Sequence, residues 1–191
     1  MITKHLTTLL LVFSIISIVF FGCKKDDENN EPPTGTANFN VSLENSAAKK
    51  SSTYESVDID IQKVSINVSS DTSETSGWFD LETNQGIYDL LDYAAGFDTL
   101  VAYDSLLNVQ TISQIRLLLG NNNTIVDGGE TFDLDTPSAQ TSGLKINVHA
   151  ELQPNMSYKV VLDFDSDKSI VKTGNNKYKL KPVINATLVQ Q

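Results

Sequence analysis

Cys23 is the side chain whose chemistry the surrounding sequence indicates most clearly. It is the only cysteine among 191 residues, and it follows a largely apolar run over residues 6–21 and the small residue Gly22. Lys4 precedes the run. A basic start, a short apolar run and a small residue are typical of a cleaved signal peptide. Because a thiol at the new N-terminus can be alkylated by a lipid, we predict a signal peptide over residues 1–22 and lipidation of Cys23.

The length of the apolar run argues against a transmembrane helix, and the single cysteine excludes a disulfide bond within the chain. A helix that spans a bilayer needs about 20 apolar residues, which is more than residues 6–21 provide. Polar residues follow the cysteine directly, so a cleaved signal is preferred over an uncleaved transmembrane helix. With one cysteine, no disulfide can form within the chain.

The segment after Cys23 predicts a tethered protein of the outer membrane that is exposed at the cell surface. Residues 20–23, with Phe20 and Phe21 at their start, resemble the looser lipidation motifs of Bacteroidetes lipoproteins. Residues 23–35 are polar after the cysteine, so we expect them to form a disordered tether that reaches roughly 20 Å. Their basic-then-acidic start is similar to the export signals of such lipoproteins and comprises Lys24, Lys25, Asp26, Asp27 and Glu28.

An acidic cluster is the best candidate for a metal site. Asp163, Asp165 and Asp167 alternate with other residues at the end of a predicted strand, which places the first two carboxylates on one face. Oxygen ligands of this kind suit calcium. The EF-hand pattern fails, however, since Lys168 and Gly174 occupy the positions of its glycine and its glutamate. We therefore predict no resident cofactor, with calcium at this cluster as the alternative.

The sequence after residue 22 offers no convergent set of catalytic groups. His149 is its only histidine, and it alternates with the apolar residues of a predicted strand, which places it on the solvent face. A Ser-His-Asp triad or a zinc site would need partners around this histidine that the sequence does not supply. We therefore predict a protein without enzymatic activity.

Alternation of apolar and polar residues predicts a single all-β domain over residues 36–191. The apolar residues fall at odd positions over 57–61 and at even positions over 64–68, which predicts a β-bulge near Gln62 and Lys63. Residues 86–107 fit short strands or one helical turn. A last strand is predicted over residues 178–189, with Pro182 at an edge or a bulge. Short strands with frequent turns are typical of an antiparallel β-sandwich, immunoglobulin-like or prealbumin-like.

Four segments together resemble a known family. They are residues 57–61, 113–117 and 142–146 and the longer stretch from Leu162 to Ile184. Their order and spacing are similar to those of the domain of unknown function 4382, which occurs in bacterial lipoproteins. The resemblance extends over residues 36–186. It implies no activity and no catalytic residues, because none is assigned to that family.

The net charge of −10 restricts the class of partner. An acidic surface repels phosphate backbones, so nucleic acid is not an expected partner. The expected partners are the membrane, through the lipid on Cys23, and an envelope protein or an extracellular glycan. We therefore predict a non-enzymatic binding or scaffold module. The alternative is a structural accessory subunit of an outer-membrane complex without a small ligand.

Overall fold

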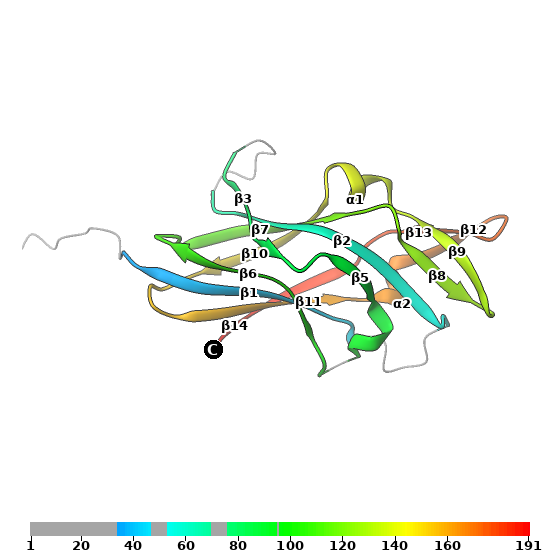
Figure 1. Ribbon diagram of the computed structural model, residues 1–191, viewed down its shortest axis with the longest axis horizontal. Helices are drawn as coiled ribbons and strands as arrows, with labels where there is room; N and C mark the ends of the chain where they lie inside the picture. The colour runs from blue at the N-terminus through cyan, green and yellow to red at the C-terminus, as the bar shows by residue number, and fades with distance from the viewer. Residues whose placement is uncertain (1–33, 47–52, 70–75, 95) are drawn as a thin grey trace, which may run out of the picture. The chain divides into compact units, whose positions relative to one another are not determined.

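Two β-sheets pack face to face in the described part of the protein, which in this computed structural model comprises residues 34–46, 53–69, 76–94 and 96–191 (Figure 1). Most of these residues belong to strands, so the prediction of an all-β sandwich is confirmed. The predicted signal peptide, Cys23 and the export residues after it lie outside the described ranges.

The smaller sheet has five strands, and the first strand of the domain lies at its centre (Figure 1). β1 (Thr36–Glu44) pairs with β6 (Thr99–Leu107) on one side and with β11 (Ser157–Phe164) on the other. β4 (Glu82–Thr83) extends the sheet beyond β6, and β14 (Ile184–Gln190) extends it beyond β11.

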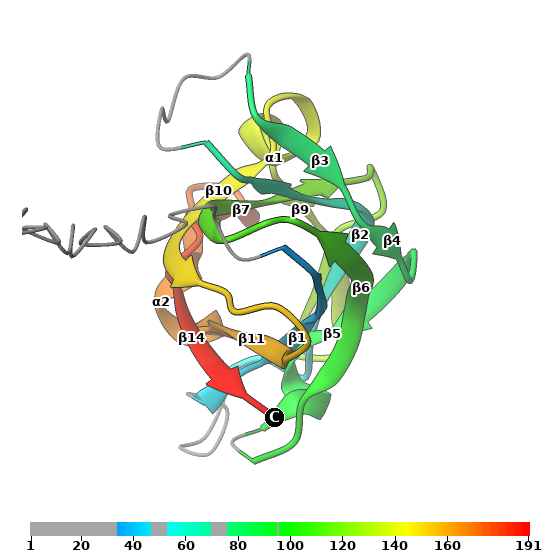
Figure 2. The ribbon, with the colours of Figure 1, turned by 90° about the vertical axis from the view of Figure 1, so that its left-hand side faces the viewer.

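The larger sheet has nine strands, in the order β10-β7-β2-β8-β9-β13-β12, with β3 and β5 also paired to β2. β10 of this sheet and β14 of the smaller sheet lie side by side (Figure 2). The nine strands are β2 (Ser56–Asn67), β3 (Trp78–Asp80), β5 (Gly86–Asp89), β7 (Thr111–Leu119), β8 (Thr124–Asp127), β9 (Glu130–Asp135), β10 (Leu144–Glu151), β12 (Ile170–Thr173) and β13 (Lys177–Leu180).

Short helices connect some of the strands. They are the 3-10 helix η2 (Leu90–Tyr93) and the α-helices α1 (Pro137–Thr141) and α2 (Ser166–Ser169). The Asp89 carboxylate caps η2 by accepting a hydrogen bond from the N–H of Leu91. The sequence left short strands or one helical turn open for residues 86–107, and the structure has both, since β5 and β6 flank η2. Among the described residues, no helix has the length and apolar character needed to cross a membrane.

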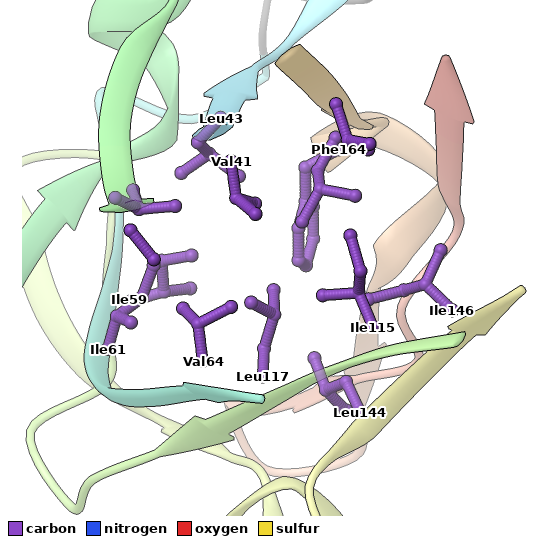
Figure 3. Close-up of a cluster of buried hydrophobic side chains, with 14 of the residues drawn as sticks. Val41, Leu43, Ile59, Ile61, Val64, Ile115, Leu117, Leu144, Ile146 and Phe164 are labelled. Atoms are coloured by element: carbon purple, nitrogen blue, oxygen red, sulfur yellow. The ribbon is translucent and has the colours of Figure 1, made fainter. Parts of the chain in front are cut away.

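The core lies between the two sheets, and both contribute apolar side chains to it (Figure 3). Full burial of such a side chain contributes about 1.5–3 kcal/mol to the stability of the fold. The apolar side chains that alternate along the sequence therefore hold the two sheets together. Among the buried side chains are Val41 and Leu43 of β1, Phe164 of β11, Ile59, Ile61 and Val64 of β2, Ile115 and Leu117 of β7, and Leu144 and Ile146 of β10.

A β-bulge in β2 keeps both halves of this strand in the core. The pairing of β2 with β7 shifts register between Ile61 and Lys63, so Gln62 is the extra residue. Ile61 and Val64 are both fully buried, although uninterrupted alternation would point them to opposite faces. The predicted bulge near Gln62 and Lys63 is therefore confirmed.

The strand pairing differs from the prediction in two respects. In the described residues the pairs of β1 with β11 and of β9 with β13 are parallel, so both sheets are mixed rather than purely antiparallel. The prediction of one last strand over residues 178–189 is wrong, since β13 and β14 belong to different sheets. Pro182 lies between them and lacks the N–H that a continued ladder needs, so the chain passes there from one sheet to the other.

Asp60 is buried, whereas the alternation along β2 predicts an outward-facing side chain. Its exposed fraction is 3%. The carboxylate accepts hydrogen bonds from the Gln62 side chain and from the backbone and side-chain N–H groups of Asn122, the last two at 3.2 and 3.1 Å. These bonds offset the cost of burying the carboxylate. Gly120 packs so closely that a Cβ there would lie 2.2 Å from a carboxylate oxygen.

Gly120→Ala is expected to destabilise the domain by about 1–3 kcal/mol, because the Asp60 carboxylate would have to leave its hydrogen bonds to make room for the methyl group. Urea unfolding followed by circular dichroism measures the change. Gly174→Ala is the matched control and should leave the unfolding midpoint almost unchanged, since a Cβ at Gly174 meets no atom within 4 Å. Equal stability of the two variants would contradict this account of the packing.

Candidate functional site

A groove of about 630 Å³ opens between β9 and β13 of the larger sheet. Its volume lies within the range of about 300–1,000 Å³ that is typical of ligand sites. Polar and charged side chains form its walls, and aromatic side chains form its floor. The lining residues are Thr131, Phe132, Asp133, Asp135, Thr173, Asn176, Lys177, Tyr178 and Lys179.

The groove exists because two β-hairpins diverge (Figure 1). β8 turns into β9 at residues 128–129, and β12 turns into β13 at residues 174–176; four of these residues are Gly or Asn with positive φ. Glycine and asparagine tolerate that conformation. The two hairpins pair only where Leu134 and Asp135 of β9 meet β13. Residues 130–133 of β9 therefore have no described strand on the side of the groove.

The two aromatic residues that line the groove, Phe132 and Tyr178, belong to a cluster of three rings that also includes Tyr54. Tyr178 is almost fully buried and lies between Tyr54 and Phe132, with ring centroids 6.1 and 5.2 Å away and interplanar angles of 88° and 43°. Edge-to-face and tilted pairs of this kind are favourable. Burial and then the neighbouring Tyr178 raise the pKa of Tyr54. Phe132 is only partly buried, so the floor offers an apolar surface to a ligand.

Hydrogen bonds to Asp127 hold Tyr178 in place in this cluster. The Tyr178 hydroxyl donates a hydrogen bond to Asp127 Oδ2 at 2.5 Å, and Lys172 Nζ donates to the same oxygen at 2.9 Å. The bond from Tyr178 and then that from Lys172 hold the pKa of Asp127 below its ordinary value. In turn, Tyr178 and Asp127 raise the pKa of Lys172. The contact ties the β8–β9 hairpin to the β12–β13 hairpin.

The walls of the groove carry both signs of charge. Asp133 and Asp135 come from β9, and Lys177 and Lys179 come from β13. The Lys179 ammonium lies 3.9 Å from the Asp135 carboxylate, and both side chains are largely exposed, so the pair is weak. The walls can therefore contact a ligand that itself carries charges of both signs.

The acidic residues considered for calcium do not converge on one point. Asp163 accepts hydrogen bonds from the backbone N–H and the hydroxyl of Ser46. Asp165 caps α2 and pairs with Lys168 at 2.6 Å. Burial acts to raise the pKa of Asp165, but the hydrogen bonds from Lys168 leave it below its ordinary value. Asp167 is exposed, and in the described residues no three His, Cys, Asp or Glu side chains gather as metal ligands would.

The other residues singled out in the sequence lie apart from the groove or outside the described ranges. His149 is exposed on β10, in agreement with its predicted position on the solvent face. It lies at an irregularity in the pairing of β10 with β7 and has a φ of 51°. Cys23 and the export residues Lys24 to Glu28 are not among the described residues, so lipidation and surface export stay predictions.

The sequence alone does not indicate the groove. Asp127 stands in a turn motif and Tyr178 in a strand pattern, and neither residue indicates a ligand by itself. The turns at residues 128–129 and 175–176 were readable, but the parallel pairing of β9 with β13 has no local signature. Only that pairing reveals that the two hairpins enclose a common space.

Asp127→Asn is expected to destabilise the domain more near neutral pH than in acid. Because the folded-state pKa of Asp127 lies below 3.8, the carboxylate stabilises the fold above that value and loses this effect as the pH falls through the folded pKa. Urea midpoints of both proteins at about pH 7 and about pH 3 test this. Asp135→Asn, which removes only a long contact, is the control. A destabilisation by Asp127→Asn that is equal at both pH values would contradict the assignment.

Comparison with known proteins bears on the resemblance seen in the sequence. No curated protein and no solved structure matches the chain. The sequence model of one family, Domain of unknown function (DUF4382), matches residues 35–182. The matched range contains most of the strands of both sheets and both hairpins of the groove. Since it covers well over half of the sequence, the chain belongs to the DUF4382 family.

Proposed function

We propose that the protein is a lipid-anchored binding module of the cell envelope that holds an extended polypeptide segment in the groove between β9 and β13. The observation that carries the proposal is the free edge of β9, where residues 130–133 face the groove without a described strand partner. An extended peptide can add to such an edge through main-chain hydrogen bonds.

The chemistry of the groove supports a peptide as the occupant. Successive side chains of an added strand point to opposite faces of the sheet. One set would lie on the side of Phe132, where the aromatic floor is accessible, and the other on the side of Asp133, where charges of both signs line the wall. Main-chain bonds would then supply affinity, and the two faces would supply selectivity.

Binding rather than catalysis is supported by the state of the groups around the groove. Asp127 is held beneath the floor by Tyr178 and Lys172, so its carboxylate is engaged in a structural contact. His149 belongs to β10 and is not among the groove residues. The binding module would hang from the outer membrane on a lipid at Cys23 through residues 23–35, with the outer cell surface as its location.

A structural accessory subunit of an outer-membrane complex, without a small ligand, is the second candidate. Exposed apolar side chains favour it, since Ile87, Phe97 and Leu100 have exposed fractions of 58, 73 and 40%. Apolar side chains on a surface often mark contacts between proteins. Photocrosslinkers placed at Phe97 and at Thr131 distinguish the two candidates in cells. An envelope protein that is captured one-to-one by the crosslinker at Phe97, and not by the one at Thr131, favours the accessory subunit.

Thr131→Pro is expected to weaken peptide binding by about tenfold, because proline removes one N–H donor from the edge of β9. The N–H of Leu134 bonds to Asn123 inside the hairpin, so alternation along the ladder turns the N–H of Thr131 toward the groove and leaves the hairpin bonds intact. Thr131→Val, which retains this N–H, should bind like the wild type.

The measurement is affinity for peptides selected from a random display library, with a glycan array tested in parallel. Peptides that lose affinity for Thr131→Pro and keep it for Thr131→Val would support strand addition. Glycans bound in place of peptides would identify a saccharide site and contradict the peptide proposal. Peptide affinities equal for the two variants would exclude main-chain pairing at Thr131.

A further inference from the structure

We propose that the end of the sandwich at which the chain enters the domain rests on the lipid bilayer, with Leu107 and Phe79 in its interfacial layer. The inference rests on the lipid anchor at Cys23 that is part of the proposed function. It assigns the apolar surface around these two side chains to the membrane that holds the anchor.

The chain outside the domain joins it directly beside Leu107. The Gly35 N–H donates to Asn108 Oδ1 at 3.1 Å, and the Asn108 N–H donates to the Gly35 carbonyl at 2.8 Å. Next to this contact, Thr36 lies opposite Leu107 in the pairing of β1 with β6. The segment from Cys23 to Gly35 comprises only thirteen residues, which would reach roughly 20 Å as the predicted flexible coil. A lipid on Cys23 would therefore keep this end of the domain close to the bilayer.

The same end exposes a continuous apolar surface. Leu107 is 67% exposed and Phe79 is 56% exposed. Both line a pocket of about 270 Å³ between β3 and β6, and Val109 contributes to it as well. β3 and β6 belong to different sheets, so the pocket lies where the edges of the two sheets meet. Figure 2 views the domain from this end.

Two loops at this end of the domain contain no charged residue. The connection of β6 to β7, residues 108–110, and that of β10 to β11, residues 152–156, lack Asp, Glu, Lys and Arg, in a chain with 20% charged residues. Charged groups are costly at the apolar layer of a bilayer, whereas uncharged loops approach it at lower cost. Of the two acidic residues lining the pocket, Asp80 is paired with Lys63 at 2.7 Å. The surface is therefore compatible with an interfacial position.

The contact sets the orientation of the domain rather than its attachment. Two apolar side chains bind a bilayer weakly, but a tether turns the contact into an intramolecular event with a high effective concentration. The β8–β9 and β12–β13 hairpins lie at the opposite end of the domain from the start of β1 (Figure 1). With Leu107 on the membrane, the groove between β9 and β13 would face away from it.

The test uses the lipidated full-length protein reconstituted into phosphatidylcholine vesicles with brominated acyl chains, which quench a nearby fluorophore. One variant, Gln153→Cys, carries the label in an exposed loop of the membrane-facing end. A second variant, Gly174→Cys, carries it at the hairpin of the far end, where a side chain meets no other atom. The thiol of Cys23 is alkylated by the lipid and takes no label. Quenching is expected at residue 153 and not at residue 174.

Substitutions then test the apolar contact itself. The double substitution Leu107→Asp with Phe79→Asp should abolish the quenching at residue 153 while the protein still floats with the vesicles. Leu107→Gln is a milder variant, with reduced quenching expected, should the double variant fail to fold. Val183→Asp, at an apolar side chain that is 39% exposed between β13 and β14, is the matched control and should retain full quenching.

If the protein floats but quenching is equal at residues 153 and 174, the inference is wrong while the lipid anchor stands. The same conclusion follows if quenching at residue 153 survives the double substitution. Failure of the wild-type protein to float would overturn the proposed lipid anchor and the inference with it. The two results are distinguishable because flotation reports the anchor and quenching reports the orientation.

Discussion

The β-bulge at Gln62 is the constraint on which the rest of the structure depends. β2 has two apolar runs in opposite phase, and one inserted residue allows both to face the core. The first half of the strand can then pair with β8 and β5, while the second half pairs with β7 and β3. The side chain of the inserted residue donates a hydrogen bond to Asp60, which is itself buried under the turn after β7. The hairpins of the groove are joined to the sandwich through β8, so the position of the candidate site also follows from this insertion.

Features that depend on neighbours in the sequence could be predicted. Alternation identified the buried faces of β1, β2, β7 and β11, and the change of phase identified the bulge. Features that depend on distant pairing could not. Nothing near β1 indicates that it pairs in parallel with β11, and a strand pattern that continues on both sides of Pro182 does not reveal that its halves belong to different sheets. Alternation predicts that the Asp60 side chain faces solvent, because a local pattern does not include the turn after β7 that covers it.

The candidate site could not be predicted from the sequence for a related reason. Tyr54, Asp127, Lys172 and Tyr178 come from four separate segments, and each has an ordinary local role. Their contacts join two hairpins whose strands pair with each other through only two described residue pairs. A rigid floor beneath a free strand edge is therefore a product of the tertiary fold. The predicted lipidation and export signals are the reverse case, since the prediction uses consecutive residues and needs no fold.

The central position of β1 has a consequence for the biogenesis of the protein. This strand is the first of the domain to be synthesised, yet its two neighbours are β6 and β11, and the second of these ends only at Phe164. The smaller sheet cannot be completed until most of the chain has been made. Such non-local pairing slows folding. A polypeptide that emerges N-terminus first from the ribosome therefore completes its smaller sheet only after most of the domain has been synthesised. If the protein is exported as proposed, this delay would keep the chain unfolded for translocation.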